Sequence, residues 1–138
     1  MYCDTYPSKL EPRMKEPNGR LVCIVDDDAS LRRSLKNLLT SVGFRVETFQ
    51  SAEAFLESAH RQNTGCMVLD LRMPGMGGLE LLRELTASGP RIPAIILTAH
   101  GDEDLRRRML QAGAVAFLSK PFQSAALVEA IRTALSPA

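Results

Sequence analysis

The feature that most constrains the fold is a repeated pair of segments: a short apolar run, then apolar residues at helical spacing. Four such runs, at residues 21–25, 66–69, 94–97 and 114–118, are typical of strands buried on both faces of a parallel sheet. A more polar run at residues 45–50 suits a strand at a sheet edge. Strict alternation of strands and helices predicts an α/β fold with one parallel sheet that helices cover on both faces. Right-handed crossovers are expected to join its strands.

Each strand is followed by a predicted helix. The first helix spans residues 29–42 and ends at Gly43, and the second follows Ser51 as N-cap. A loop rich in Pro and Gly, residues 72–78, precedes the third helix. The apolar positions expected to face the core in the last four helices are Ala52, Phe55, Leu56 and Ala59; Leu79, Leu82 and Leu85; Leu105, Met109 and Ala112; and Leu127, Ala130, Ile131 and Ala134.

The length of 138 residues predicts one folded domain, which we place at residues 21–136. Residues 1–20 contain three prolines among scattered charges and show no regular period, so they are predicted to form a flexible tail. The sequence has no apolar run near the roughly 20 residues that span a bilayer, and the first 20 residues lack the apolar core of a signal peptide. We therefore expect a cytoplasmic protein without a membrane partner.

The charge balance and the cysteines exclude several further classes. Seventeen Lys and Arg against sixteen Asp and Glu leave a net charge of +1, so no broad electrostatic field favours direct binding to nucleic acid. Arg106, Arg107 and Arg108 spread around a helix axis and are expected to be solvated. The three cysteines form no metal-binding spacing, and Cys23 and Cys66 are interpreted as small core residues.

Residues with reactive side chains stand where the predicted strands end. Asp26 and Asp27 follow the first strand, Asp70 ends the third, Thr98 ends the fourth, and Lys120 follows the fifth. In open α/β sheets, ligands bind beyond the carboxyl ends of the strands, where strand order reverses. We therefore expect these five side chains to converge at one edge of the sheet.

This set of side chains favours phosphoryl transfer. Three neighbouring carboxylates repel each other unless a cation neutralises them, and an oxygen-only ligand set favours Mg²⁺. A lysine supplies a second positive charge for the transferred phosphoryl group. Asp70 is the best candidate for a nucleophile because it stands alone at a central strand end. Asp26 and Asp27 are adjacent and suit metal binding, directly or through water.

Four motifs resemble the receiver domain of two-component response regulators, most closely the FixJ-type group. These motifs are VDDD after the first strand, LDLRMPGMGGLELL around Asp70, ILTAHGD after the fourth strand and FLSKPF at the fifth. The resemblance extends from residue 21 to about residue 136 and includes the reactive residues at the strand ends. It implies a flavodoxin-like (βα)5 doubly wound fold with the strand order 2-1-3-4-5.

The resemblance also implies roles for individual residues. Asp70 would accept a phosphoryl group from a sensor histidine kinase, a phosphotransfer protein or a small phosphodonor. Asp26, Asp27, Asp70 and the backbone carbonyl of Arg72 would hold Mg²⁺. The side chains of Arg72 and His100, which flank the phosphorylation site, would tune the rate at which the phosphoryl group is hydrolysed.

The remaining implied roles concern switching. Lys120 would pair with Asp70 or its phosphate, and the bond from Lys120 to Pro121 would be cis. Thr98 would donate its hydroxyl to the phosphoryl group, and Phe117 would swing inward behind it. Phosphorylation adds negative charge and acceptor oxygens, and it would bias the surface formed by the fourth helix, fifth strand and fifth helix.

Three alternatives to this interpretation differ in their chemistry. A Mg²⁺-dependent phosphohydrolase with an aspartyl nucleophile would need a general acid and a substrate cap, and no insertion is long enough for a cap. A flavodoxin-like FMN binder would need a phosphate loop in the place of Asp26, Asp27 and Asp28. The third alternative is a receiver-like interaction module that works without phosphorylation. We expect no enzyme beyond the catalysis of its own phosphorylation and autodephosphorylation.

The sequence ends at Ala138, shortly after the last predicted helix. FixJ-type receivers usually precede a DNA-binding domain, so we expect no output domain in these residues. The protein would act as a separate receiver on a downstream protein target, or as part of a longer regulator. Phosphorylation-dependent homodimerisation through the fourth helix, fifth strand and fifth helix is a further expectation.

Overall fold

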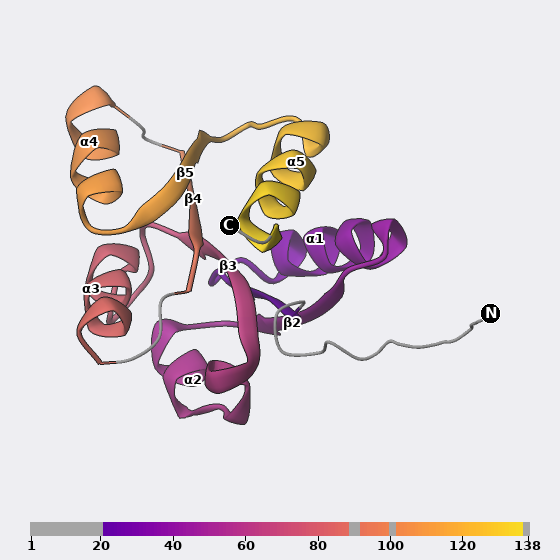
Figure 1. Cartoon of the computed structure of the whole chain (residues 1–138), viewed down its shortest axis with the longest axis horizontal. Helices are drawn as coiled ribbons and strands as arrows, with labels where there is room; N and C mark the ends of the chain where they lie inside the picture. The colour runs from indigo at the N-terminus through magenta and orange to yellow at the C-terminus, as the bar shows by residue number, and fades with distance from the viewer. Residues whose placement is uncertain (1–20, 89–91, 100–101, 137–138) are drawn as a thin grey trace.

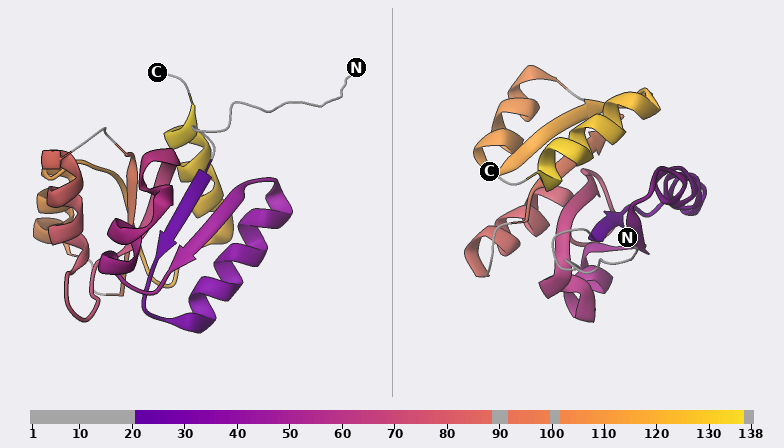
Figure 2. Two further views of the ribbon diagram at one scale, coloured as in Figure 1. Left: turned by 90° about the horizontal axis from the view of Figure 1, so that it is seen from below. Right: turned by 45° about the vertical axis from the view of Figure 1, so that its right-hand side comes forward.

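A single five-stranded parallel sheet in the order β2-β1-β3-β4-β5 forms the centre of the computed structural model, which describes residues 21–88, 92–99 and 102–136. This strand order confirms the predicted flavodoxin-like topology, with the polar strand β2 at one edge. The arrows of β1 and β2 run side by side in one direction (Figure 2). The predicted tail, residues 1–20, lies outside the described residues. The strands are β1 (Leu21–Val25), β2 (Arg45–Phe49), β3 (Thr64–Asp70), β4 (Ala94–Thr98) and β5 (Ala114–Ser119).

Helices cover both faces of the sheet, as the alternation of elements predicts. Helices α1 and α5 lie on one side, and α2, α3 and α4 lie on the other (Figure 1). No helix in the described part of the chain is long and apolar enough to cross a membrane. The helices are α1 (Ala29–Val42), α2 (Ala52–Glu57), α3 (Gly78–Ser88), α4 (Glu103–Gln111) and α5 (Ser124–Leu135), with a 3-10 helix η1 at Ala59–Asn63.

Two hydrophobic cores lie on either side of the sheet because successive strand residues point to opposite faces. In β1, Leu21, Cys23 and Val25 face α2, α3 and α4, whereas Val22 and Ile24 face α1 and α5. All five side chains are buried. The central strands are thus packed on both faces, which explains their continuous apolar sequence.

The second helix differs from the prediction. We expected one helix face to run from Ala52 to Ala59, but α2 ends at Glu57 and residues 59–63 form η1. Ser58 interrupts the helix because its backbone is extended, and its hydroxyl accepts the N–H of His60 to cap η1. The predicted N-cap of α2 is confirmed, since the Ser51 hydroxyl accepts the N–H of Ala54.

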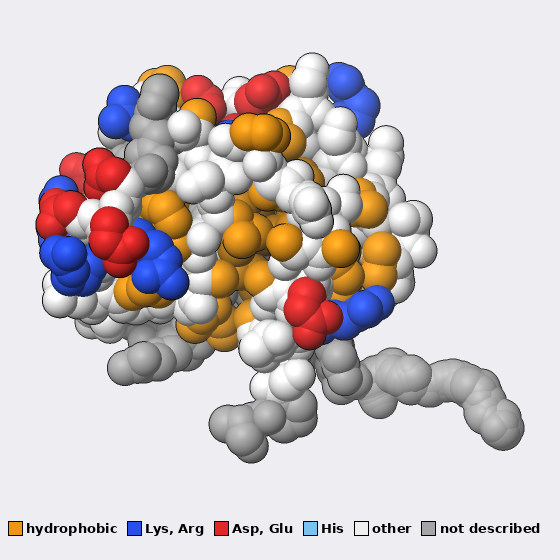
Figure 3. All heavy atoms as spheres, turned by 90° about the horizontal axis from the view of Figure 1, so that it is seen from above, with side chains coloured by type: hydrophobic (Ala, Val, Ile, Leu, Met, Phe, Trp, Pro, Cys, Tyr) orange, Lys and Arg blue, Asp and Glu red, His pale blue; other side chains and the backbone are white. Residues whose placement is uncertain are grey.

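The charged run on α4 is solvated, as expected. Arg106 and Arg107 form exposed ion pairs one helical turn away, with Glu103 at 3.7 Å and with Asp104 at 3.1 Å. Side chains of both charges gather over α4 in the space-filling view, with hydrophobic side chains visible between α4 and α5 (Figure 3). Exposed pairs of this kind contribute about 0.3–0.5 kcal/mol each, so the arginines serve mainly as a polar surface.

The two described cysteines are buried in different cores, Cys23 on the α2 side and Cys66 on the α1 side. Burial raises the pKa of Cys23 to about 11 and that of Cys66 to about 12. Both thiols therefore stay protonated at pH 8, and only the thiolate reacts. In a Cys3→Ser variant at pH 8, we expect iodoacetamide to add nothing to the folded protein and two groups after unfolding in urea, measured by intact mass. Labelling of the folded protein would contradict this burial.

Candidate functional site

The parallel sheet brings the ends of four strands together at one edge. Asp26 follows β1, Asp70 ends β3, Thr98 ends β4 and Lys120 follows β5. Neighbouring strands are in register here, with Val25 opposite Leu69 and Asp70 opposite Leu97. The structure thus places the predicted residues on adjacent strand ends, although they are up to 94 positions apart in the sequence.

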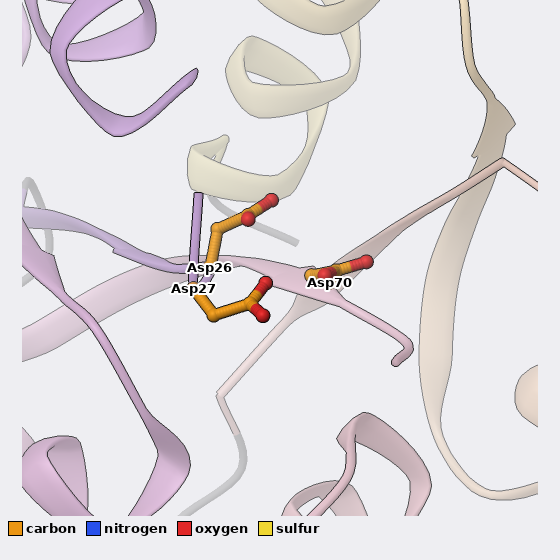
Figure 4. Close-up of side chains that lie close together, drawn as sticks. All are labelled: Asp26, Asp27 and Asp70. Carbon is orange, nitrogen blue, oxygen red and sulfur yellow. The ribbon is translucent and has the colours of Figure 1, made fainter. Parts of the chain in front are cut away.

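Three carboxylates form the acidic cluster, which we define as Asp26, Asp27 and Asp70. Each contributes an oxygen that lies within 4.8 Å of the others. Figure 4 shows Asp26 and Asp27 on the segment after β1, beside Asp70 at the end of β3. Asp26 and Asp70 are buried, with residue exposures of 1% and 8%, and Asp27 is exposed. One side of the cluster is therefore open to solvent.

Lys120 supplies the positive charge beside the cluster. Its Nζ lies 3.5 Å from Oδ2 of Asp26 and 3.7 Å from Oδ1 of Asp70, so it bridges two of the acids rather than pairing with Asp70 alone. The backbone N–H of Lys120 donates to the carbonyl of Thr98 at 2.7 Å, which ties its position to the end of β4. The peptide bond from Lys120 to Pro121 is cis.

The electrostatic balance of the cluster is unfavourable to the charge on Asp70. Burial raises the pKa of the Asp70 carboxyl, and the neighbouring Asp26 carboxylate raises it further. Lys120 and a hydrogen bond from the backbone N–H of Arg72 act in the opposite direction. An additional cation would relieve this repulsion, and three carboxylate ligands with a solvent-open side suit Mg²⁺.

The end of β1 is held by contacts that we did not predict from the sequence. The Asp26 carboxylate accepts the N–H of Asp28 at 2.9 Å, and Asp28 in turn caps α1. The guanidinium of Arg32 donates to the backbone carbonyl of Asp26 at 2.8 Å. Arg32 stands one turn into α1, at a position where a surface arginine is ordinary, so no local signal marks it.

The loop after Asp70 is closed tightly onto the sheet. The N–H of Leu71 donates to Leu97 at 3.1 Å, and the N–H of Gly78 donates to the carbonyl of Leu71 at 3.0 Å. A Cβ on Gly78 would lie 2.7 Å from the backbone oxygen of Asp70, so this position accepts only glycine without a shift of the backbone. The glycine-rich sequence therefore allows α3 to start directly against the end of β3.

The remaining predicted residues lie at different distances from the cluster. Arg72 is exposed, and its backbone N–H acts to lower the pKa of Asp70. Phe117 on β5 is half-buried and packs against the core on the α2, α3 and α4 side. Thr98 is buried, with 1% exposure. His100, the second residue expected to tune hydrolysis, lies outside the described residues.

A family model, the response regulator receiver domain, matches residues 22–132. The chain belongs to this family. Magnesium-dependent phosphorylation of an aspartate is typical of receiver domains, which are in general not enzymes in the usual sense. The acidic cluster therefore matches the kind of pocket at which receivers bind Mg²⁺. The family match favours the receiver over the phosphohydrolase, FMN-binding and interaction-module alternatives.

Relatives and solved structures agree with the receiver assignment. The receiver is 40% identical over 135 residues to the response regulator protein TmoT of Ectopseudomonas mendocina, covering 98% of this chain and 61% of that protein. It is 48% identical over 113 residues to the transcriptional regulatory protein FixJ of Rhizobium meliloti strain 1021, covering 82% and 55%. The crystal structure of FixJ-N is 46% identical with a TM-score of 0.77, covering 84% and 93%. The chain thus spans 61% of the length of TmoT and 55% of the length of FixJ.

Proposed function

We propose that this receiver is phosphorylated on Asp70 in a Mg²⁺-dependent reaction with a phosphohistidine of a sensor histidine kinase or phosphotransfer protein. The observation that carries the proposal is the acidic cluster at the carboxyl edge of the sheet, with Lys120 against two of its members. In the transfer, a carboxylate oxygen of Asp70 attacks phosphorus, the bond from phosphorus to histidine nitrogen breaks, and the histidine leaves. The product is an acyl phosphate.

The residues around Asp70 would have different roles in this reaction. Asp26, Asp27, Asp70 and the backbone carbonyl of Arg72 would hold Mg²⁺, which when bound neutralises charge on the phosphoryl oxygens. The Nζ of Lys120 lies 3.7 Å from Oδ1 of Asp70 and would supply a positive charge to the phosphoryl group. Burial of Asp70 strengthens these interactions by limiting the number of competing water molecules.

The switch that follows phosphorylation would pass through Thr98 and Phe117. Thr98 ends β4 beside Asp70, and its hydroxyl would bond the phosphoryl oxygens. Ser119 on β5 lies opposite Thr98 on β4, and Phe117 precedes Ser119 by two residues. Phe117 would move inward behind Thr98. The backbone hydrogen bond from Lys120 to Thr98 couples the ends of β4 and β5, so a shift of either residue would displace both strand ends. The surface of α4, β5 and α5 would then change.

The proposed partners follow from this switch. They are the sensor kinase on the input side, and a downstream protein target or an effector domain on the output side. Phosphorylation would favour a homodimer through α4, β5 and α5. Arg72 and His100 would tune the rate of autodephosphorylation. The proposal retains the predictions of a cytoplasmic location and of no direct contact with nucleic acid by this domain.

Incubation with acetyl phosphate and Mg²⁺ tests the proposal directly. We expect an intact-mass increase of one phosphoryl group, and none when a chelator replaces Mg²⁺, because the acidic cluster repels an anionic donor without a cation. Beryllofluoride, a phosphoryl analogue, provides a control for rapid hydrolysis: its binding without a lasting adduct indicates a short-lived phosphate. No adduct and no beryllofluoride binding would contradict phosphorylation at this site.

A further inference from the structure

Glu53 on α2 contacts the loop that follows Asp70, at a residue 23 positions later in the sequence. Its Oε2 accepts the backbone N–H of Met76 at 3.0 Å. Met76 lies in the loop formed by residues 71–77, which we call the β3–α3 loop. The bond therefore connects a helix on one flank of the sheet to the segment that carries the carbonyl of Arg72.

The position of Glu53 is fixed by the packing of α2. Ser51 caps the helix two residues before Glu53, with its hydroxyl 3.0 Å from the N–H of Ala54. Two residues after Glu53, Phe55 is fully buried and packs edge-to-face against Phe49, with ring centroids 5.4 Å apart. A short helix anchored in this way presents Glu53 from a rigid support rather than from a free loop.

The carboxylate of Glu53 also occupies the space beside Gly75. A Cβ on Gly75 would lie 2.9 Å from Oε2 of Glu53, and the φ angle of Gly75 is +78°, which favours glycine. The loop thus turns at the point where the carboxylate of Glu53 occupies the space beside it. Glu53 thus hydrogen bonds to Met76 and fills the space in which a side chain on Gly75 would lie.

The carboxylate of Glu53 stays charged in this contact. Its pKa is lowered mainly by the hydrogen bond from Met76 and also by a hydrogen bond from its own backbone N–H. A charged acceptor forms stronger hydrogen bonds to backbone N–H groups than a neutral one does. The contact is therefore maintained throughout the neutral pH range.

Two further hydrogen bonds lie at the base of the β3–α3 loop. The N–H of Gly78 bonds to Leu71, and the N–H of Gly77 bonds to Oε1 of Glu80 at 2.7 Å. These bonds close the base of the loop, and the side chains of Met73 and Met76 pack against the core on the α2, α3 and α4 side. Glu53 adds a hydrogen bond from α2 to the backbone of the loop at Met76.

We propose that Glu53 is a positioning residue for the Mg²⁺ site. By holding the β3–α3 loop at Met76, it fixes the backbone that presents the carbonyl of Arg72 beside Asp70. This inference rests on the proposed function, because it assigns Glu53 a role in the binding of the same Mg²⁺. Loss of the contact would loosen the loop first and weaken Mg²⁺ binding in consequence.

The first measurement requires no metal. Amide hydrogen exchange at Met76 and Arg72 is compared in the wild type, Glu53→Ala, Glu53→Gln and the control Glu57→Gln. We expect exchange at Met76 to accelerate about tenfold in Glu53→Ala, to rise less in Glu53→Gln, which keeps an acceptor, and to stay unchanged in the control. Glu57 is exposed on the same helix and carries the same charge, so it controls for charge alone.

The second measurement is a titration of backbone amide chemical shifts with MgCl₂. We expect Glu53→Ala to bind Mg²⁺ about three- to tenfold more weakly, Glu53→Gln to recover part of this loss, and Glu57→Gln to match the wild type. Equal losses in Glu53→Gln and Glu53→Ala would overturn the proposal and indicate an effect of charge. Wild-type affinity in Glu53→Ala would also overturn it.

Gly75→Ala tests the contact from the loop side. Its methyl group would displace the Glu53 carboxylate and strain the positive φ, so we expect a loss of Mg²⁺ affinity similar to that of Glu53→Ala. The double variant should lose less than the sum of the single losses, since both break one contact. Fully additive losses would overturn the proposal. If the wild type binds no Mg²⁺, the proposed function and this inference both fail, whereas faster Met76 exchange alone would still locate the contact.

Discussion

Replacement of Asp70 by Asn is expected to abolish phosphoryl incorporation completely and, at the same time, to stabilise the metal-free protein. The amide of Asn has nearly the shape of the carboxylate but is not a nucleophile, so acetyl phosphate with Mg²⁺ should add no mass. The same sample should show one phosphoryl group on the wild type. An equal adduct on both proteins would place the phosphorylation on another residue and refute the role of Asp70.

The stability gain follows from the repulsion within the acidic cluster. Two unit charges about 5 Å apart interact by roughly 3 kcal/mol at an effective dielectric constant of about 20, and Lys120 offsets part of this for Asp70. We therefore expect Asp70→Asn to raise the free energy of unfolding by about 1–2 kcal/mol at pH 7 in the presence of a chelator. Lys120 keeps a partner in this variant because it also lies 3.5 Å from Asp26.

The pH dependence of this gain has a definite sign. The pKa of Asp70 is raised in the folded state, chiefly by burial and then by Asp26, so its ionisation destabilises the fold. The protonated carboxyl of Asp70 contributes its full share to the free energy of unfolding below about pH 3.9, the pKa of Asp in the unfolded chain. This contribution is lost as pH rises through the higher pKa of Asp70 in the folded protein. Urea unfolding should thus show no difference between the two proteins near pH 3 and a difference that grows as pH rises. A constant difference would contradict this assignment.

Gly78→Ala is expected to damage both the fold and the site, whereas the adjacent Gly77→Ala should be tolerated. A methyl group on Gly78 would lie 2.7 Å from the backbone oxygen of Asp70 and 3.0 Å from Cα of Leu71. Both neighbours are backbone, so α3 and the end of β3 must separate. Overpacking of this kind costs about 1–3 kcal/mol, and we expect the upper part of this range.

The effect of Gly78→Ala on chemistry should exceed its effect on stability. A displacement of reacting groups by about 1 Å can lower a rate by about a hundredfold, and Gly78 abuts the residue that carries the proposed nucleophile. A methyl group on Gly77 would meet its nearest atom at 3.4 Å, so this variant is the matched control. Urea unfolding and the initial rate of phosphorylation by acetyl phosphate measure the two effects. Similar behaviour of the two variants would show that the approach of α3 to β3 is not constrained.

The fold could be predicted from the sequence because its apolar runs, its helical periodicity and its helix-terminating residues all indicate the same elements. The buried strands are continuous apolar runs, the helices have one apolar stripe, and Gly43 and Ser51 terminate and start helices where expected. The convergence of Asp26, Asp70, Thr98 and Lys120 followed from topology alone, since carboxyl ends of parallel strands share an edge. The prediction failed after Glu57, where Ser58 adopts an extended backbone that propensity does not reveal.

The contacts that hold the site in place could not be predicted in the same way. Arg32 and Glu53 look like ordinary exposed residues of amphipathic helices, and their partners are backbone groups of Asp26 and Met76. A backbone partner leaves no chemical signature in the sequence, because every residue but proline offers the same N–H. The distance in sequence between Glu53 and Met76 removes the remaining local cue.

The reactive residues come from strand ends that span the described chain, from Asp26 after the first strand to Lys120 after the last. During synthesis, the ribosome releases Asp26, Asp27 and Asp70 well before Lys120. A nascent chain without β5 has the acids but lacks the lysine that offsets their repulsion. Under the proposed function, a kinase would therefore find a competent acceptor only on a finished sheet. The position of Lys120 after the last strand would then limit phosphorylation to a receiver whose sheet is complete.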